Sequence, residues 1–514
     1  MNLTYRSHQN ALSKVLVAAA VLAGARLVSA CGDDDAPPPP PADGGRDLGA
    51  DLGADGGGPD VDAGPVGMIR IVHASPNTPA IDVYAGTSAT PAIDALAYTE
   101  TSDYLMLPAG TYTFNVRADG AAADSTPALV VADFVLAAGD KYTIVAAGSL
   151  TSTDAADRLR VLPLQEEFGA LGGNARVRIV HAGFNAPTVA IDVGDDGTSE
   201  VASLERFADT GADGVSLPAG AAQVGVLTTG AGATKVSAFT APIVAAEIFV
   251  IATGDVTQNA RLDTSFGLLA VGPAGTVGFL KQNPRVYALH GSPDAPAVEI
   301  FAGTAELVGG VTYGDIAGPL QVPPGDYTLD FFPVTAGTAR PAGAPAGTDD
   351  VDGLVAGNTY LAVANGFLAP RAGTTDAPFQ VLALVEGFDL ADAANVRVRA
   401  VHGSPSAPSV TVGAVTGTAI TTALASDVAF GASTAAEGAS LPATTYTIGF
   451  AAGATTTPVL ARFTAPLTAA GKRWFAIAHG DFAAVAGREP FGVFAVDTSV
   501  TPWTVTDLPS APAP

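Results

Sequence analysis

The sequence is poor in cysteine, tryptophan and charged side chains. Among 514 residues it has one cysteine, two tryptophans and 14% charged residues. A single cysteine cannot form a disulfide within the chain, so the fold must be held by other means. Alanine and glycine are abundant and no long charged helical pattern occurs, which argues against coiled coils and helical arrays. Short apolar strands fit this composition better.

Basic residues are also scarce. The chain has 24 lysines and arginines against 50 acidic residues, a formal net charge of −26. Such a chain repels phosphate backbones and anionic lipid headgroups. Nucleic acid is therefore excluded as an expected partner.

Several sequence signatures of catalysis are missing. The chain has no Walker loop, no dinucleotide-binding fingerprint, no H-E-x-x-H and no G-x-S-x-G elbow. These motifs carry phosphate binding, zinc binding and serine activation in many enzymes. We therefore expect no cofactor and no catalytic activity.

The N-terminal region has the features of an export signal. Arg6 and Lys14 precede an apolar run over 15–25, which is shorter than the roughly twenty residues that span a bilayer. The sequence LVSAC that follows is similar to the lipobox of bacterial lipoproteins, in which the cysteine is lipid-modified. We expect residues 1–31 to be a lipoprotein signal peptide and Cys31 to anchor the protein to a membrane, the alternative being a secretory signal that ends near a cysteine by chance. Gly32, where an aspartate would indicate inner-membrane retention, favours the outer membrane.

Residues 32–66 have almost no apolar side chains. Nine aspartates face one arginine, and glycine and proline alternate with them. No core can form from this composition, which predicts a disordered linker. The aspartates lack the D-x-[DN]-x-[DN]-G spacing of a calcium loop, so no metal site is expected there.

The remainder of the chain repeats one pattern four times. The stretch RIVHASPNTPAIDVYAG at Arg70 recurs, with changes, around four histidines that lie 108, 109 and 112 residues apart: His73, His181, His290 and His402. LPAGTY-like turns and KYTIVAAG-like strands follow in the same order in each copy. A period near 110 residues is too long for a solenoid or a propeller blade and suits an independent domain. We expect four domains, at 67–168, 174–272, 283–387 and 394–500, and a proline-rich tail at 501–514.

Each copy has the character of an antiparallel β-sandwich. The first copy contains about seven short runs of strand character, separated by turn residues every ten or so positions. In the second copy Val177, Ile179 and His181 share one face of a strand, and Arg176 and Arg178 share the other. We expect the histidine to face the core and the arginines to face solvent.

The V-H-[AG]-S-P-x-x-P-x-[VI]-[DE]-[VI] opening, the LPAG-T-Y turn and the tandem repetition resemble the bacterial family called domain of unknown function 4397. The resemblance covers about residues 67–500. The second copy departs from it, with Gly183 and Phe184 in place of Ser-Pro. The resemblance implies four immunoglobulin-like sandwiches exported to the cell envelope, and no established activity. The expected fold class is therefore all-β.

The repeated histidine invites an enzymatic interpretation, with His73 as base, Ser75 as nucleophile and Asp82 as the orienting acid. The repeats argue against it, because Gly183 replaces the serine in the second copy and Thr411 replaces the acid in the fourth. Asp82 is also expected on the strand face opposite the histidine.

A zinc site needs three or four ligands. Each copy offers one histidine and at most one nearby acid, at Asp82, Asp192 or Glu299. We interpret the four histidines instead as structural, each using a ring nitrogen to satisfy a backbone group in the proline turn.

Two functional hypotheses follow. The first is a non-catalytic, lipid-anchored surface protein that displays four sandwiches for adhesion, matrix contact or envelope structure. The second is recognition of an extracellular glycan or peptide, for which Trp474 and His479 in the fourth copy are the candidate contacts. Ligand-binding loops are expected where the copies differ most, at 86–101, 194–212 and 333–350.

Overall fold

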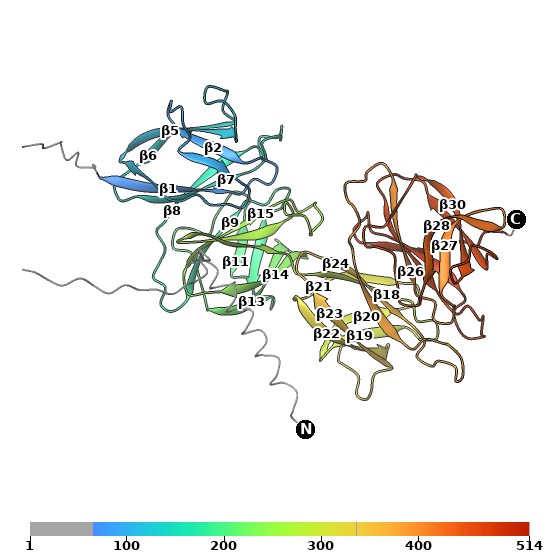
Figure 1. Cartoon of the computed structure of the whole chain (residues 1–514). Coiled ribbons are helices and arrows are strands. Elements are labelled where there is room, and N and C mark those ends of the chain that lie inside the picture. Colours follow the sequence, from blue (N-terminus) through green and yellow to red (C-terminus); the bar gives the residue numbers. More distant parts are fainter. Residues whose placement is uncertain (1–64, 336, 513–514) are drawn as a thin grey trace, which may run out of the picture. The chain divides into compact units, whose positions relative to one another are not determined.

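The computed structural model describes residues 65–335 and 337–512, and every regular element in these ranges is a strand. The predicted signal peptide, Cys31 and linker lie outside them. The 34 strands form eight sheets, which pair face to face into four sandwiches. No helix in the described ranges is long and apolar enough to span a membrane. The all-β fold class is confirmed (Figure 1).

One sheet of each sandwich contains the strand that ends in the repeated histidine, and we call it the histidine sheet. In sandwich 1 its order is β4 (Leu105–Pro108), β1 (Val66–His73), β7 (Lys141–Ala147), β8 (Arg160–Gln165). In sandwich 2 it is β12 (Val215–Leu217), β9 (Ala175–His181), β15 (Glu247–Thr253), β16 (Gly267–Gly272), β17 (Gly275–Lys281). In sandwich 3 it is β21 (Ile316–Gln321), β18 (Arg285–His290), β24 (Thr359–Asn365), β25 (Gln380–Val385). In sandwich 4 it is β29 (Ala439–Leu441), β26 (Val396–His402), β32 (Arg473–His479), β33 (Gly492–Asp497), β34 (Thr504–Asp507).

The second sheet of each sandwich has four strands. In sandwich 1 the order is β3 (Ile93–Leu96), β2 (Ile81–Ala85), β5 (Gly110–Ala118), β6 (Leu129–Leu136). In sandwich 2 it is β11 (Val201–Leu204), β10 (Val189–Val193), β13 (Gly220–Thr228), β14 (Lys235–Ile243). In sandwich 3 it is β20 (Ala305–Val311), β19 (Val298–Ala302), β22 (Gly325–Pro333), β23 (Gly347–Leu354). In sandwich 4 it is β28 (Ala419–Val428), β27 (Val410–Thr416), β30 (Thr444–Ala452), β31 (Ala461–Leu467).

The histidine sheets are mixed rather than purely antiparallel. In each, the strand that ends in histidine pairs in parallel with a later strand, as β1 does with β7. This pairing sets the four histidines opposite four alanines: Ala146, Ala252, Ala364 and Ala478. Strand direction leaves no mark on a short apolar run, so the sequence did not reveal it. The small neighbour leaves room for the imidazole ring.

Sandwich 1 has eight strands, one more than the seven runs recognised in its sequence, and sandwiches 2 and 4 have nine each. In sandwich 1 the additional strand is β3, and β11 has the same position in sandwich 2. Both are four-residue edge strands with half of their residues exposed. The stretches 86–101 and 194–212, expected to be loops, each contain one of these strands, and 333–350 runs into β23. Short, exposed edge strands lack the alternation that identifies longer ones.

The histidine sheets are covered on both faces. In sandwich 1, Ile69 and Ile71 of β1 pack into the core against the second sheet, whereas Val72 packs against Val180 and Phe249 of sandwich 2. Sandwiches 3 and 4 share an equivalent cluster that includes Leu289, Val401 and Phe475. The sandwiches therefore pack in pairs, 1 with 2 and 3 with 4, through apolar faces.

This packing overturns the expectation of a solvent-facing arginine for Arg178, whereas Arg176 is half-buried. Arg178 is 7% exposed, and its guanidinium donates to Gln165 O (2.6 Å) and to Asp209 Oδ1 (2.7 Å). Arg399 of sandwich 4 likewise donates to Val385 O (2.8 Å). Gln165 and Val385 each end the last strand of the preceding sandwich. A sheet covered on both faces buries the residues that alternation assigns to solvent.

Arg70 is the most deeply buried charge at the contact between sandwiches 1 and 2. It is 2% exposed and donates to Thr143 Oγ1 (2.8 Å) and across the contact to Gly272 O (2.7 Å). Its guanidinium also pairs with Glu166 Oε1 (3.4 Å). Burial raises the pKa of Glu166, but hydrogen bonds from Thr143 and Tyr104 and the charge of Arg70 outweigh it and hold that pKa below its usual value.

Candidate functional site

The repeated histidines make one contact in common. Nε2 of His73 lies 3.0 Å from the carbonyl oxygen of Pro79, six residues later. The corresponding distance is 2.9 Å in each of the other three copies, for the pairs His181–Pro187, His290–Pro296 and His402–Pro408. A carbonyl oxygen only accepts hydrogen bonds, so Nε2 carries the proton and donates. These contacts are the ones that the structural interpretation requires.

The second ring nitrogen faces a backbone donor in three copies. The N–H groups of Ser75, Gly183 and Ser292 point at the Nδ1 atoms of their histidines at 3.3 to 3.4 Å. Protonation of Nδ1 would set two donors against each other, so the geometry requires a neutral ring. Burial lowers the pKa of all four histidines, although the hydrogen bond to the proline carbonyl raises it in part. A ring held neutral between two main-chain groups is poorly placed to take a proton from a substrate.

The serine of the motif is buried and donates to the main chain. Ser75 Oγ lies 2.6 Å from the carbonyl oxygen of Gly148, the residue after β7, and it also lies 2.5 Å from Thr78 Oγ1. Ser292 and Ser404 make the same contact with Gly366 (2.8 Å) and Gly480 (2.7 Å). These hydroxyls are engaged in fixing the turn to the neighbouring strand.

Sandwich 2 makes the same connection with a different donor. Its turn has Gly183 and Phe184 where the others have Ser-Pro, and the Phe184 N–H donates to Gly254 O at 2.8 Å. Proline has no N–H, so in the other copies the serine hydroxyl supplies the missing donor. The turn keeps its length from His181 to Pro187. The departure of the second copy from the motif is thus an exchange of one hydrogen-bond donor for another.

The accepting residue is glycine in every copy. Gly148, Gly254, Gly366 and Gly480 have φ between +79° and +92°. A Cβ atom at these positions would lie 1.9 to 2.4 Å from a backbone oxygen of the following loop. Both the backbone conformation and the close approach therefore require glycine.

The acid that follows the turn is buried as well. Asp82 is 3% exposed and its Oδ1 accepts the Ala95 N–H at 2.9 Å, so it lies on the face away from the sandwich core but not in solvent. Asp192 accepts the Gly197 N–H (2.7 Å), and Thr411 donates to Gly453 O (2.7 Å). Asp192 lies two residues further along its strand, where Ala190 has the position of Asp82. Polar side chains on this strand face thus hold local loops, and in sandwich 4 a threonine does so at the position of Asp82.

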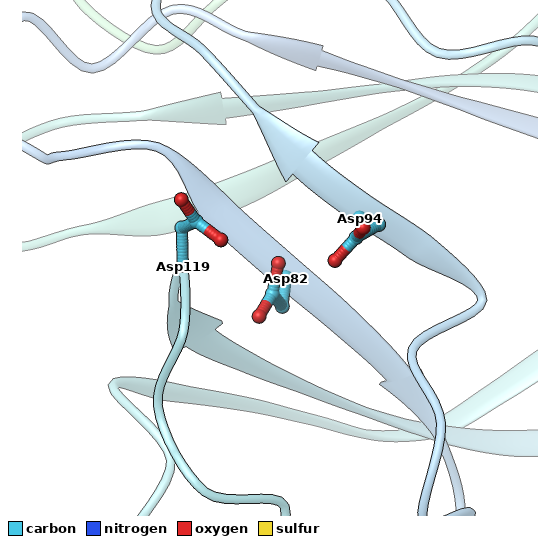
Figure 2. A group of neighbouring side chains, drawn as sticks. All are labelled: Asp82, Asp94 and Asp119. Carbon is cyan, nitrogen blue, oxygen red and sulfur yellow. The ribbon is translucent and has the colours of Figure 1, made fainter.

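Sandwich 1 alone brings three acids together within the described ranges. Figure 2 shows Asp82 on β2, Asp94 on β3 and Asp119 in the turn after β5, and their carboxylate oxygens lie within 4.8 Å of one another. Sequence reasoning missed Asp94 and Asp119, because nothing in the pattern indicated that β3 is a strand. Asp94 and Asp119 are exposed, and no histidine or cysteine joins the group. Oxygen ligands alone suit calcium or magnesium rather than zinc.

The two candidate ligand contacts of sandwich 4 lie in packed surroundings. Trp474 is half-buried and packs on the core of its sandwich. His479 is 4% exposed, with Nδ1 2.7 Å from the Tyr313 hydroxyl of sandwich 3 and its ring stacked 3.5 Å from Phe494. Burial lowers the pKa of His479, and its contact with Asp507 opposes that shift. The structure does not bring Trp474 and His479 together on an open surface.

Two segments of the chain match the family described as "Domain of unknown function (DUF4397)", at residues 67–192 and 284–413. The chain therefore carries this domain in two copies. The segments are equivalent, since one runs from β1 into β10 and the other from β18 into β27. Each spans the first sandwich of a pair and the opening strands of the second. The family thus matches at the same place in each sandwich pair.

The comparison with solved structures gives a distant match. The chain is similar to the Bacillus anthracis TIE protein, with 9% sequence identity, a TM-score of 0.13, and coverage of 78% of this chain and 65% of that one. The chain thus spans about two thirds of the length of that protein. No curated protein sequence matches the chain.

Proposed function

We propose that the chain is a non-catalytic, lipid-anchored protein of the bacterial cell envelope that displays four β-sandwiches for adhesion, matrix contact or envelope structure. The non-catalytic assignment in this proposal rests on the hydrogen bonds that the side chains of the repeated motif make. In all four copies the histidine donates to a proline carbonyl, and in three a serine donates to a glycine carbonyl. The histidines and serines that could take part in catalysis are thus engaged in hydrogen bonds that stabilise the turn.

The membrane anchor rests on the sequence around Cys31, which is similar to a lipobox and lies outside the described ranges. A diacylglycerol-bearing and acylated cysteine provides several chains, which is enough for stable anchoring without a membrane-spanning helix. The pairing of sandwiches supports the display function. Each pair buries its histidine sheets in the contact, so the second sheets and the loops remain available to partners. An outer-membrane location is part of the same proposal.

The anchor is tested in cells that express the full chain. We expect metabolic labelling with a fatty acid to mark the protein and Cys31→Ser to abolish the label. Mass spectrometry of the peptide that begins at residue 31 should show the modified cysteine. Protease added to intact cells should cleave the sandwiches if they are displayed outside. An unmodified cysteine in a processed, soluble protein would exclude the anchor.

The glycan or peptide hypothesis stays a prediction. A glycan array probed with the purified protein tests it, and binding that is lost on Trp474→Ala but kept on Trp474→Phe would favour it over simple display. The non-catalytic assignment has its own test. Hydrolysis of an envelope polymer that disappears with His73→Gln, while circular dichroism remains unchanged, would overturn it.

A further inference from the structure

The interior of sandwich 4 contains a cavity. Its volume is about 130 Å³, against about 50 Å³ for the corresponding cavity in sandwich 3. Five alanines contribute to its wall: Ala400, Ala465, Ala476, Ala478 and Ala495. Apart from His402, Trp474 and Thr506, the lining side chains are apolar. An engineered apolar cavity of about 150 Å³ stays free of water and takes up benzene.

Two polar atoms at this cavity have no hydrogen-bond partner. Trp474 Nε1 and His402 Nδ1 are both buried and unpartnered, and both residues line the cavity. At the position of Trp474, sandwich 3 has Tyr360, whose hydroxyl accepts the Val355 N–H at 3.0 Å. In the other three copies the histidine Nδ1 faces a backbone N–H. These two atoms of sandwich 4 therefore lack the hydrogen bonds that their counterparts in sandwich 3 make.

A buried N–H without an acceptor is destabilising, and native proteins rarely tolerate one without a reason. An apolar void likewise forfeits the dispersion contacts of its wall. One molecule could relieve both costs. It would fill the void with carbon and present one oxygen to the indole N–H.

Part of the cavity wall comes from the C-terminal segment. Leu508 lines the cavity, and its N–H donates to Val493 O of the histidine sheet (2.9 Å). Residues 509–511 then bond to the second sheet, where Pro509 O accepts the Thr464 N–H and the Ala511 N–H donates to Arg462 O, both at 2.9 Å. Few hydrogen bonds hold this segment, which we call the strap. Its opening would give access to the interior.

We propose that sandwich 4 binds a compact, largely apolar molecule of about six to eight non-hydrogen atoms, aromatic or branched aliphatic, with one hydrogen-bond acceptor that Trp474 Nε1 engages, and that the strap over 508–511 is its lid. The size follows from the cavity, since benzene fills a space of similar volume. The acceptor follows from the unpartnered indole.

Calorimetric titration of the full-length chain with benzene tests the cavity. We expect saturable binding at one site with a Kd on the order of 1 mM or lower. Ala476→Leu places a larger side chain in the cavity and should weaken binding at least tenfold. The matched control is Ala362→Leu, at the equivalent position of sandwich 3, which should bind as the parent does. Absence of saturable binding, or equal binding by both variants, would overturn the proposal.

Nuclear magnetic resonance tests the acceptor without changing the cavity wall. The chain has two tryptophans, so Trp503→Phe identifies the indole signal of Trp474. Cyclopentanone, which carries a carbonyl acceptor, should move that signal downfield as it saturates. Methylcyclopentane, of nearly the same shape, should bind without this downfield movement. Equal shifts with both probes would show that Trp474 donates no hydrogen bond to the occupant.

Discussion

Tyr287 of sandwich 3 stacks on Trp503, with 4.3 Å between ring centroids and 7° between the ring planes. Trp503 comes just before the last strand of sandwich 4 and is 6% exposed. Tyr287 occupies the strand position that Arg70 has in sandwich 1. The two pairs thus use different side chains at equivalent contacts, an arginine reaching a carbonyl in one and an aromatic stack in the other.

Trp503→Ala should destabilise the pair of sandwiches 3 and 4. Loss of a buried tryptophan leaves a void and removes the stack, a cost of about 3 to 5 kcal/mol. Urea unfolding followed by circular dichroism measures it. Trp503→Phe, which keeps an aromatic ring on Tyr287, should lose less than half as much. An unchanged midpoint for Trp503→Ala would show that the stack does not join the sandwiches.

Arg70→Met should loosen the contact between sandwiches 1 and 2. The substitution removes the ion pair of Arg70 with Glu166 and the hydrogen bond to Gly272 O, while Lys141 still pairs with Glu166 at 3.0 Å, which predicts a loss of about 1.5 to 3 kcal/mol. The linker over 168–175 should also become more sensitive to limited proteolysis. Arg117→Met is the control, because Arg117 is also buried but donates only to Ser125 O of its own sandwich. The same proteolysis rate in both variants would contradict a joining role for Arg70.

Ser75→Ala should cost about 1 to 3 kcal/mol, because it leaves the Gly148 carbonyl without its hydroxyl donor. Sandwich 2 suggests a specific rescue. The double substitution Ser75→Gly and Pro76→Phe introduces a backbone N–H where Phe184 has one, and it should recover at least half of the loss. Thermal unfolding of the three proteins gives the comparison. Failure of the double variant to improve on Ser75→Ala would mean that the two turns are not interchangeable.

Gly254→Ala should be strongly destabilising. Gly254 has φ +85°, and an added Cβ would lie 2.0 Å from Ser265 O. We expect a loss of more than about 2 kcal/mol, well above the effect of an ordinary surface change. Gly278→Ala provides the control, since an added Cβ there meets nothing within 4 Å. Similar midpoints for the two variants in chemical denaturation would refute the requirement for glycine.

Stability should fall as the pH drops below about 6.5. Burial gives the four motif histidines and His479 pKa values below the ordinary 6.5, so the unfolded chain binds more protons than the folded chain in this window. The contribution is therefore fully present above 6.5 and is lost as the pH falls toward the folded pKa. Each histidine adds a slope of at most about 1.4 kcal/mol per pH unit.

Urea unfolding between pH 8 and 5 measures this slope, above the range in which carboxylates such as Glu166 titrate. His290→Gln keeps a donor for the Pro296 carbonyl and removes the titrating ring, so it should flatten the profile by one histidine's share. A profile that is level from pH 8 to 5 would contradict buried, neutral imidazoles.

The histidine turn was largely predictable from the sequence. Four copies of one pattern, each with a histidine six residues before a proline, indicated a turn stabilised by a histidine hydrogen bond. The hydrogen bonds from histidine Nε2 to the proline carbonyl have that spacing. The cluster of Asp82, Asp94 and Asp119 was not predictable, because Asp94 lies on an edge strand too short and too exposed to show a period. The cavity of sandwich 4 depends on which alanines face one another across two sheets, and spacing along the chain does not reveal this.

The sequence by itself determined that the chain is all-β, that one unit recurs four times and that each histidine closes a proline turn. These properties are local, because side-chain alternation, turn residues and short spacings involve residues that are close together in the sequence. Tertiary structure alone decided that β1 pairs in parallel with β7, that Arg70 and Arg178 are buried, and that the sandwiches pack in pairs. Alternation along a strand indicates which residues share a face. The element that covers the second face is distant in sequence, so only the folded structure determines whether that face is buried.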